Sequence, residues 1–515
     1  MHFYPKARQR RLSISHPAVR SSRLKFLKLT GLNFVLLQLL FLALFSYLFG
    51  SLFHQTDHIH NINVVFVDYD GGLIGTAVRQ AYQQLQGEGF PTLIEQPPQR
   101  YESPTILQSV VCNIDYWAAL YTTPNATDRL ATALTGGTAA SSYNQSDVLI
   151  YIWNEARYST IADSAVAGSL EKLSESARLA YSQLNGTGAV QTLPATDTAA
   201  VEVFTSPWTL TSVDIQPTTQ GSRLIYNTLV FILVLIQDFF FLGTVNGLYA
   251  QLNLWIKLSP KRMVIFRLLL SAAYTFVGSL CVTGSIWAFR KGWHVNGNQF
   301  VLTWISIWLF GHLNFLTLDV FTVWLPPPFV PMALITWIVL NVTSILLPFE
   351  LSPAFYQWGY ALPAHALYQI LIDIWSGGCN PQLDYALPVL FAYELSSLAL
   401  SCIGVYRRSH LAFVANEGEE KKLQECIATT LAEEPADLEK TSSRREDRSS
   451  EGAAPTDEES ALEPAAPMRK LSTVASSPAE RQELAERITR ETSRFRLERG
   501  TRSTDRGPTF DLVGE

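Results

Sequence analysis

The sequence lacks the short motifs that mark the common ATP-hydrolysing and hydrolytic enzymes. It contains no Gly-x4-Gly-Lys-Ser/Thr phosphate loop, no Gly-x-Ser-x-Gly nucleophile elbow and no His-Glu-x-x-His zinc helix. We therefore expect that the polypeptide does not hydrolyse ATP by itself, has no catalytic residues and is not an enzyme. Energy for any work that it performs is expected from a partner, a gradient or the lipid phase.

Cysteine and net charge are also scarce. Five cysteines in 515 residues do not make a disulfide scaffold, and a formal net charge of -6 gives no reason to expect a nucleic-acid partner. We predict no cofactor and no metal site. The best candidate for a metal site shows no closed geometry and is interpreted as a polar collar at the lipid headgroups; it consists of His54, Asp57, His58 and His60.

Long apolar runs are what the sequence has instead. The hydrocarbon core of a bilayer is about 30 Å thick and needs roughly 20 apolar helical residues to span it. The fourth and fifth runs are separated by Pro326 to Pro328, where a helix cannot continue. The first run exceeds the core of a signal peptide, so we interpret it as a retained anchor. About six spans predict a polytopic α-helical membrane protein: Leu29–Phe53, Leu224–Tyr249, Met263–Phe289, Phe300–Trp324, Phe329–Leu347 and Tyr385–Tyr406.

Lysine and arginine residues near the spans predict the orientation of the chain, because they concentrate in cytosolic loops. Eight precede the first span, and two further loops on the same side carry Lys257, Lys261, Arg262, Arg407 and Arg408. Both termini are therefore expected in the cytosol, although Arg290 and Lys291 go against the rule. The predicted domains are a basic cytosolic arm (1–28), the first transmembrane helix (29–53), an extracytoplasmic α/β domain (54–221), a membrane domain of five helices (222–408) and a disordered cytosolic C-terminal tail (409–515).

The extracytoplasmic segment shows alternating strand and helix signals. The stretch from 186 to 221 is rich in Thr and Pro and is interpreted as a linker back to the membrane. Short runs rich in β-branched and aromatic residues predict strands, and helical spacing or composition predicts the helices between them; the strands are Ile62–Val67, Tyr116–Tyr121 and Val148–Trp153, and the helices are Ile74–Leu85 and Glu155–Leu184.

Two kinds of covalent modification are expected in the same compartment. Three N-x-S/T sequons, at Asn125, Asn144 and Asn185, lie in the segment that the topology places outside and predict N-glycosylation. Cys112 and Cys379 are the only cysteines predicted on that side, where disulfides are permitted. They are the candidate disulfide pair.

Ionisable residues inside the spans are the candidate functional residues. Asp238, His312 and Glu394 fall near the midplane of three different helices, where a charge is costly and usually faces protein or water. If they converge, they could bind a cation, a proton or a polar headgroup; the alternative is that each only hydrogen-bonds a neighbouring helix. Arg267 and Asp319 lie about one turn inside the cytosolic face and predict a structural ion pair, unless Arg267 extends to lipid phosphates.

Two further segments carry their own signals. The aromatic-rich segment 348–383 contains the apolar stretch Ala361–Trp375, which is too short to cross and predicts an interfacial or re-entrant helix on the outer side. That helix would anchor the protein or form a lateral gate for an amphiphile. The tail has few aromatic residues and is expected to be disordered, with Ser472 and Ser477 as candidate phosphorylation sites.

Several stretches resemble a known family. They are the strand and turn Val65-Phe66-Val67-Asp68-Tyr69-Asp70-Gly71-Gly72, the segment from Trp117 to Pro124, and the run Pro348-Phe349-Glu350-Leu351-Ser352-Pro353. With the anchor and the block of five spans, they resemble the fungal nitrosoguanidine-resistance membrane protein family. More distantly, the layout is similar to the membrane domains of type-2 ABC permeases and the phage-infection-protein group. The resemblance implies a fungal surface protein linked to drug or mutagen tolerance.

Two functions are therefore considered. The first is a plasma-membrane protein that contributes to drug or mutagen resistance by export or transbilayer handling of amphiphilic compounds or lipids. The alternative is a non-transporting regulator or scaffold that affects membrane lipid organisation or the stress response. The expected partners are membrane lipids, a small amphiphilic drug and proteins that bind the tail, with no nucleic acid.

Overall fold

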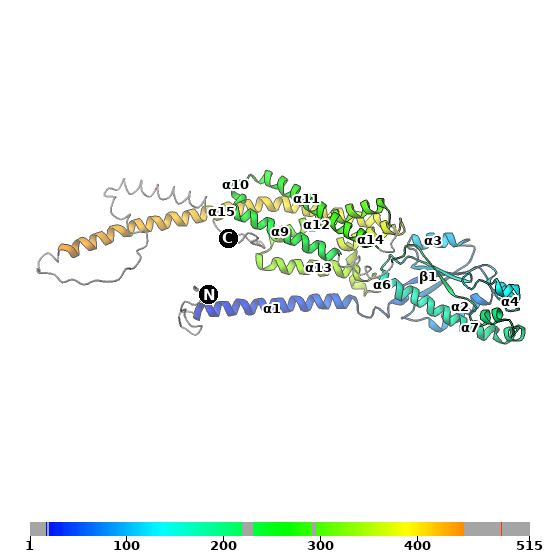
Figure 1. The fold of residues 1–515 in the computed structure, drawn as a ribbon. Helices are drawn as coiled ribbons and strands as arrows, with labels where there is room; N and C mark the ends of the chain where they lie inside the picture. Colours follow the sequence, from blue (N-terminus) through cyan, green and yellow to red (C-terminus); the bar gives the residue numbers. More distant parts are fainter. Residues whose placement is uncertain (1–16, 18–19, 219–229, 291–294, 447–485, 487–515) are drawn as a thin grey trace, which may run out of the picture. The chain divides into compact units, whose positions relative to one another are not determined.

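The computed structural model describes residues 17, 20–218, 230–290, 295–446 and 486 (Figure 1). The chain divides into two compact units, each built from several segments. The first comprises Met1–Phe241, Leu270–Phe321 and Leu325–Ala399. The second comprises Leu242–Leu269, Thr322–Trp324 and Leu400–Glu515.

A five-stranded sheet lies at the centre of the α/β domain, which belongs to the first unit. β1 is parallel to both β2 and β3, β3 is antiparallel to β4, and β4 is parallel to β5. The three strands expected from the sequence correspond to β1, β3 and β4. The strands, in the sheet order β2-β1-β3-β4-β5, are Thr92–Gln96, Asn63–Asp68, Ala118–Thr122, Leu149–Trp153 and Leu210–Asp214.

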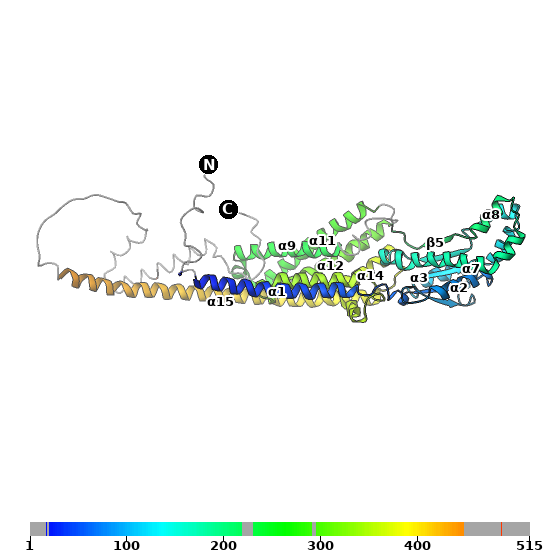
Figure 2. The same cartoon turned by 90° about the horizontal axis from the view of Figure 1, so that it is seen from below.

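Helices cover both faces of this sheet (Figures 1 and 2). Alternate side chains of β1 point to opposite faces, so Val64 and Phe66 join one apolar core and Val65 and Val67 join the other. Helices α2 and α7 contribute to the first core and α3 to the second. The helices of this domain are α2 (Leu73–Leu85), α3 (Pro104–Cys112), α4 (Ala126–Ala133), α5 (Thr138–Ser141), α6 (Ser159–Ile161) with a π-helical continuation (Ala162–Ala167), α7 (Gly168–Thr192) and α8 (Thr198–Thr205).

The prediction of a linker at 186–221 was wrong for most of that segment. Helix α7 continues to Thr192, Asp197 caps the amino end of α8, and β5 completes the sheet beside β4. Trp208 is fully buried and donates its indole N–H to the Ser174 hydroxyl at 3.1 Å. Local composition did not reveal these elements, because β5 pairs with a strand about 60 residues earlier and is recognised only in the folded sheet.

Within the described part of the chain, six helices are long and apolar enough to cross a membrane. Each overlaps one of the six predicted spans, although residues 224–229 of the second lie outside the described residues. A short 3-10 turn at Pro327–Phe329 separates α12 from α13, as the three prolines indicated. Asn296 and Gln299 form a capping box at the start of α12. The helices are α1 (Arg20–Ser51), α9 (Val230–Gln251), α11 (Pro260–Ala288), α12 (Gly297–Trp324), α13 (Val330–Leu346) and α15 (Leu383–Glu446), with the short α10 (Leu254–Lys257) between α9 and α11.

The aromatic-rich segment forms a 3-10 helix at Ala354–Ala361 and α14 at Pro363–Trp375. Eleven of the thirteen residues of α14 are buried, on all sides of the helix. An interfacial helix keeps one face against lipid headgroups, so this burial contradicts the interfacial interpretation. Its short length agrees with the expectation that it does not cross the membrane.

The expected disorder from residue 409 onward was wrong for 409–446, because α15 continues to Glu446. This stretch is rich in Ala, Leu, Glu and Lys, which are strong helix formers. The candidate phosphorylation sites Ser472 and Ser477 lie outside the described residues, as does most of the basic arm before Arg20.

Candidate functional site

A polar cluster connects three apolar helices of the first unit. The Nδ1 atom of His312 on α12 lies 2.7 Å from Oε1 of Glu394 on α15. The His312 side chain is 15% exposed and the Glu394 side chain 14%. The Nε2 atom of His312 lies 3.1 Å from the Ser271 hydroxyl on α11. With a neutral imidazole, Nδ1–H donates to Glu394 and Nε2 accepts from Ser271. The cluster therefore holds a titratable pair inside the membrane-spanning part of the chain.

One oxygen of this cluster has no hydrogen-bond partner. Glu394 Oε2 is buried and unpaired, whereas the nearby Thr317 hydroxyl donates to the Leu313 backbone oxygen at 2.8 Å and lies 2.9 Å from the Ser397 hydroxyl, from which it can accept. A buried carboxylate oxygen without a donor is costly, which distinguishes Glu394 from a carboxylate whose two oxygens are both hydrogen-bonded.

Asp238 faces a separate cavity among α9, α11 and α12. The residue is 3% exposed, and its Oδ2 atom has no hydrogen-bond partner. The sequence left open whether Asp238, His312 and Glu394 converge. The structure brings His312 and Glu394 together, while the residues lining the cavity beside Asp238 are Val234, Gln237, Thr275, Gly278, Ser279, Ile307 and Gly311.

Arg267 belongs to the second unit and Asp319 to the first, so the predicted ion pair between them stays a prediction. Within the second unit, Arg267 Nη1 donates to Asn246 Oδ1 at 3.1 Å, and its guanidinium lies 5.0 Å from the centre of the Tyr249 ring. Arg408 donates to the same Asn246 oxygen at 3.0 Å. Arg267 is buried, which argues against a side chain that extends to lipid phosphates.

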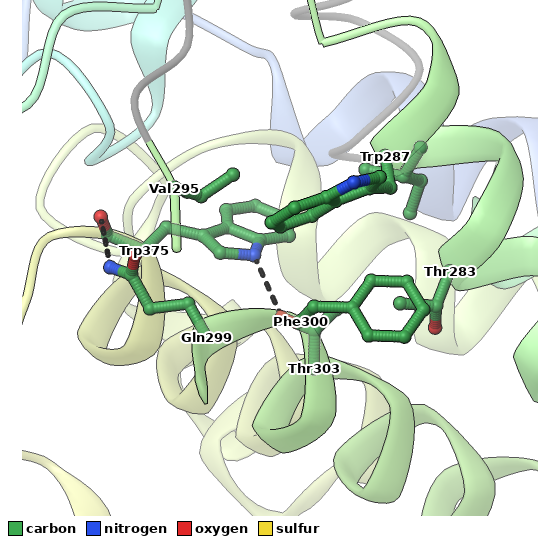
Figure 3. A pocket seen from close by; sticks show the side chains of 8 residues that line it. Thr283, Trp287, Val295, Gln299, Phe300, Thr303 and Trp375 are labelled. Carbon is green, nitrogen blue, oxygen red and sulfur yellow. Dashed lines mark hydrogen bonds between the residues drawn. The ribbon is translucent and has the colours of Figure 1, made fainter. Parts of the chain in front are cut away.

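Aromatic side chains of α11, α12 and α14 surround a second cavity (Figure 3). It has room for about one molecule of the size of water and is lined by Trp287, Phe300 and Trp375. The Trp375 indole N–H donates to the Thr303 hydroxyl at 3.1 Å, as drawn in Figure 3. The Thr283 hydroxyl, also on this lining, is buried without a hydrogen-bond partner.

The acidic motif at the end of β1 has a different character. Strands β1 and β3 are parallel, so Asp68 lies opposite Thr122 at their carboxyl ends. Asp68 Oδ1 accepts hydrogen bonds from the Thr122 hydroxyl at 2.7 Å and the Gly71 amide at 2.9 Å, and Oδ2 accepts from Arg79 at 2.7 Å. The Asp68 side chain is only 4% exposed, and a Cβ atom on Gly75 would lie 2.0 Å from its Oδ2.

The second aspartate of this motif is equally engaged. Asp70 Oδ1 accepts from the Thr127 amide at 2.9 Å, and its Oδ2 bonds to the Thr127 hydroxyl. The carboxylates therefore fix the turn from β1 to α2 and leave little capacity for a ligand.

The histidines near residue 54 are occupied in a similar way. His58 Nδ1 and His60 Nδ1 lie 2.9 Å and 2.7 Å from the backbone oxygens of His54 and Asp57. Among the described residues, no group of three or more His, Cys, Asp or Glu side chains is arranged to hold a metal ion.

A disulfide joins Cys112, at the end of α3, to Cys379, after α14. Sequence reasoning missed the contacts beside it: the Tyr158 amide donates to the Tyr368 hydroxyl at 3.1 Å, and Asn154 Nδ2 donates to the Cys379 oxygen at 3.1 Å. These contacts attach the loop after β4 to α14. The aromatic richness of 348–383 was their only sequence signal.

Another site that the sequence did not reveal lies at the ends of β4 and β5. The Asp214 carboxyl accepts a hydrogen bond from the Glu155 amide at 3.1 Å. Burial, followed by the neighbouring Glu155 carboxyl, raises the pKa of Asp214 to about 7 despite the opposing backbone hydrogen bond. Two carboxyls that share a site in this way retain a proton near neutral pH.

These features define a multi-pass membrane protein with an α/β domain inserted after the first of six apolar helices. The chain belongs to the DUF3533 family of proteins of unknown function, whose sequence profile matches residues 33–399. It is 23% identical over 436 residues to an uncharacterised endoplasmic reticulum membrane protein of Saccharomyces cerevisiae, an alignment that covers 76% of this chain and 83% of the yeast protein. No solved structure matches the chain.

Proposed function

We propose that this protein moves amphiphilic compounds or lipids across the bilayer and that protonation of the His312–Glu394 pair drives the movement. The 2.7 Å contact between these side chains is the observation that supports the proposal. It connects α12 to α15, and its attraction depends on whether the imidazole is protonated and the carboxyl ionised. A proton entering or leaving the pair would therefore change how strongly the two helices are held together.

The aromatic cavity supplies a candidate position for the amphiphile. Trp287, Phe300 and Trp375 offer flat apolar surfaces, and the unpartnered Thr283 hydroxyl offers one hydrogen bond. The cavity has room for only about one water-sized molecule, so the surrounding helices would have to move apart before it held a compound with an apolar body and a single polar group. Trp375 ends α14, and this helix would have to leave its buried position to act as the lateral gate. Export of such compounds would confer the drug or mutagen resistance that the sequence resemblance implies.

The proposed orientation places the α/β domain on the extracytoplasmic side and both termini in the cytosol. The disulfide between Cys112 and Cys379 supports it, because such bonds persist in oxidising compartments. Asn125 and Asn144 are exposed, while Asn185 lies within α7 with its amide bonded to Tyr181. We expect N-glycans at Asn125 and Asn144, seen as a mobility shift on glycosidase treatment that the Asn→Gln variants lose.

The proposed membrane is the plasma membrane, although the yeast relative is described as an endoplasmic reticulum protein. Fluorescence microscopy of the full chain tagged at its C-terminus, beside markers for both membranes, decides between them. A signal confined to the reticulum would overturn the plasma-membrane assignment and would redirect the proposal from export to lipid handling within the cell.

Reconstitution in liposomes tests the transport proposal. Transbilayer movement of a fluorescent phospholipid, and separately of a labelled hydrophobic drug, is followed with and without a proton gradient. We expect gradient-dependent movement that falls at least tenfold in Glu394→Gln and His312→Gln, on the order expected for loss of a titrating group. Glu417→Gln, an exposed glutamate later in α15, is the matched control. Movement of neither probe by the wild type would contradict the proposal.

The alternative function, a non-transporting regulator or scaffold, is favoured by one observation. Helix α15 extends to Glu446, well beyond the length needed to cross a bilayer, and could present a docking surface for proteins. Truncation after Lys422 separates the two functions. A transporter keeps its activity in liposomes without this extension, whereas a scaffold loses resistance in cells although the truncated chain still reaches the membrane.

A further inference from the structure

Three helices enclose a small cavity next to Asp238. Asp238 on α9 is the only ionisable residue among its lining side chains, and Oδ2 of Asp238 has no hydrogen-bond partner. Gly311 on α12 borders the free space, whereas the Gln237 side-chain amide occupies the space beside Gly278 on α11. A Cβ atom added to Gly311 would lie 3.9 Å from Asp238 Oδ2 and 3.7 Å from the Cβ atom of Thr275. The enclosed space holds about one molecule of the size of water.

The hydroxyl groups on the lining are oriented by their own helix. Thr275 donates its hydroxyl hydrogen to the backbone carbonyl oxygen of Ser271 at 2.8 Å, and Ser279 donates to the backbone carbonyl oxygen of Phe276 at 2.9 Å. A hydroxyl whose hydrogen is already donated can offer only its lone pairs to another group. Both residues are buried. The cavity therefore presents the Asp238 carboxylate and two hydroxyl oxygens as acceptors, beside the side-chain amide of Gln237.

We infer that this cavity is a binding site for a single Na⁺ ion. Hard cations bind oxygen ligands, and carboxylate and hydroxyl oxygens are what Asp238, Thr275 and Ser279 supply. One carboxylate balances one positive charge, whereas a divalent ion would leave an uncompensated charge in a low-dielectric region. The small space favours Na⁺ over a larger monovalent ion. The inference deepens the proposed function by adding a coupling ion, but binding is measured without transport.

Thermal unfolding of the purified full-length protein in lipid nanodiscs tests this inference. NaCl is increased at constant ionic strength and pH, with choline chloride or KCl as the replacement salt. We expect a saturable rise of a few degrees in the unfolding temperature with NaCl, because a ligand that binds the folded state stabilises it. An equal rise with KCl would overturn the assignment to Na⁺, and no rise relative to choline would overturn the site.

Matched variants assign the effect to the cavity. Asp238→Asn keeps the shape of the side chain and should abolish the rise, while Gly311→Ala, which keeps the ligands but fills part of the space, should reduce it. Glu394→Gln should leave it unchanged. If Asp238→Asn does not fold, direct binding of radioactive Na⁺ to Thr275→Val and Ser279→Ala replaces it, with an expected loss of affinity of about tenfold for each removed ligand. Unchanged affinity in both variants would overturn the site.

The Na⁺ site and proton-driven transport can each be overturned without the other. Na⁺-dependent stabilisation that disappears in Asp238→Asn establishes the cation site even if no lipid or drug moves in liposomes. Proton-driven movement without any Na⁺ effect would keep the proposed function and overturn the cation site.

Discussion

Buried carboxylates occur in both the α/β domain and the apolar helices, and they are treated differently in the two regions. Asp68 receives hydrogen bonds on both oxygens, from Thr122, Gly71 and Arg79. Asp238 and Glu394 each keep one buried oxygen without any partner. Among the described residues, Asp68 therefore has donors on both oxygens, whereas Asp238 Oδ2 and Glu394 Oε2 have none to compensate for the lost hydration.

This difference indicates which carboxylates hold the fold together and which are free to act. A carboxylate with hydrogen-bond donors on both oxygens stabilises the elements that supply those donors, so its removal should unfold them. A carboxylate with one oxygen that lacks a donor contributes less to the free energy of unfolding, and that oxygen can accept a proton or a cation. The stretches that carry the family resemblance include Asp68 and Asp70, whose carboxylates fix the turn after β1, and we propose Asp238 and Glu394 as the functional residues.

The largest expected effect is on the stability of β1. Asp68→Ala would leave Thr122, the Gly71 amide and Arg79 without their acceptor, at a cost of about 3 kcal/mol, which corresponds to roughly a hundredfold loss of protection. Amide hydrogen exchange of β1 and β3 in the full-length protein measures it. Asp115→Ala, which changes an exposed aspartate in the same domain, is the control. Unchanged protection in Asp68→Ala would show that the hydrogen-bonded carboxylate does not stabilise β1.

A smaller effect is expected at the edge of the sheet and depends on pH. The pKa of Asp214 is raised to about 7 in the folded protein, first by burial and then by Glu155, so the protonated form is favoured. The stabilisation is complete below the unfolded pKa near 4 and is lost as the pH rises through about 7. After allowing for partial exposure, we expect β5 to lose about 2 kcal/mol over this range.

Hydrogen exchange of β5 between pH 5 and 8, corrected for the intrinsic rate, measures this change. The Asp214→Asn variant should show no such dependence, since its amide does not titrate. Protection that instead increases with pH in the wild type would show that the carboxyl pair is not protonated in the folded protein.

The smallest effect is expected for the exposed pair of His54 and Asp57. Exposed ion pairs contribute little because water and salt screen them, so Asp57→Asn should leave the unfolding temperature unchanged. Adding Zn²⁺ should also leave it unchanged, because His58 and His60 each direct Nδ1 to a backbone oxygen. A rise in the unfolding temperature with Zn²⁺ that Asp57→Asn removes would restore the metal interpretation.

The sequence predicts the membrane helices well because their signal is local. An apolar run of about 20 residues specifies a span by itself. Strands β1, β3 and β4 are likewise recognisable in the sequence as short apolar runs. Strands β2 and β5 do not, because they are partly exposed edge strands stabilised by partners distant in sequence. The continuation of α15 past residue 408 was missed because low hydropathy was equated with disorder.

The candidate site was only partly predictable for a related reason. Counting along each span gives the depth of Asp238, His312 and Glu394, but depth does not give the rotation of a helix about its axis. Packing of α12 against α15 brings His312 to Glu394, and packing of α9 against α11 and α12 turns Asp238 toward Thr275 and Ser279. The contact between Tyr158 and Tyr368 joins residues 210 positions apart and has no local signature.

The most direct test of the account measures stability and transport on the same Glu394→Gln protein. We predict an unfolding temperature in nanodiscs within about 1 °C of the wild type, because Glu394 Oε2 has no partner to lose and a glutamine oxygen can still accept from His312. Proton-driven lipid movement in liposomes should fall at least tenfold, as expected when a titrating group is removed. A marked loss of stability with transport retained would contradict the central claim, because it would make Glu394 a structural carboxylate like Asp68.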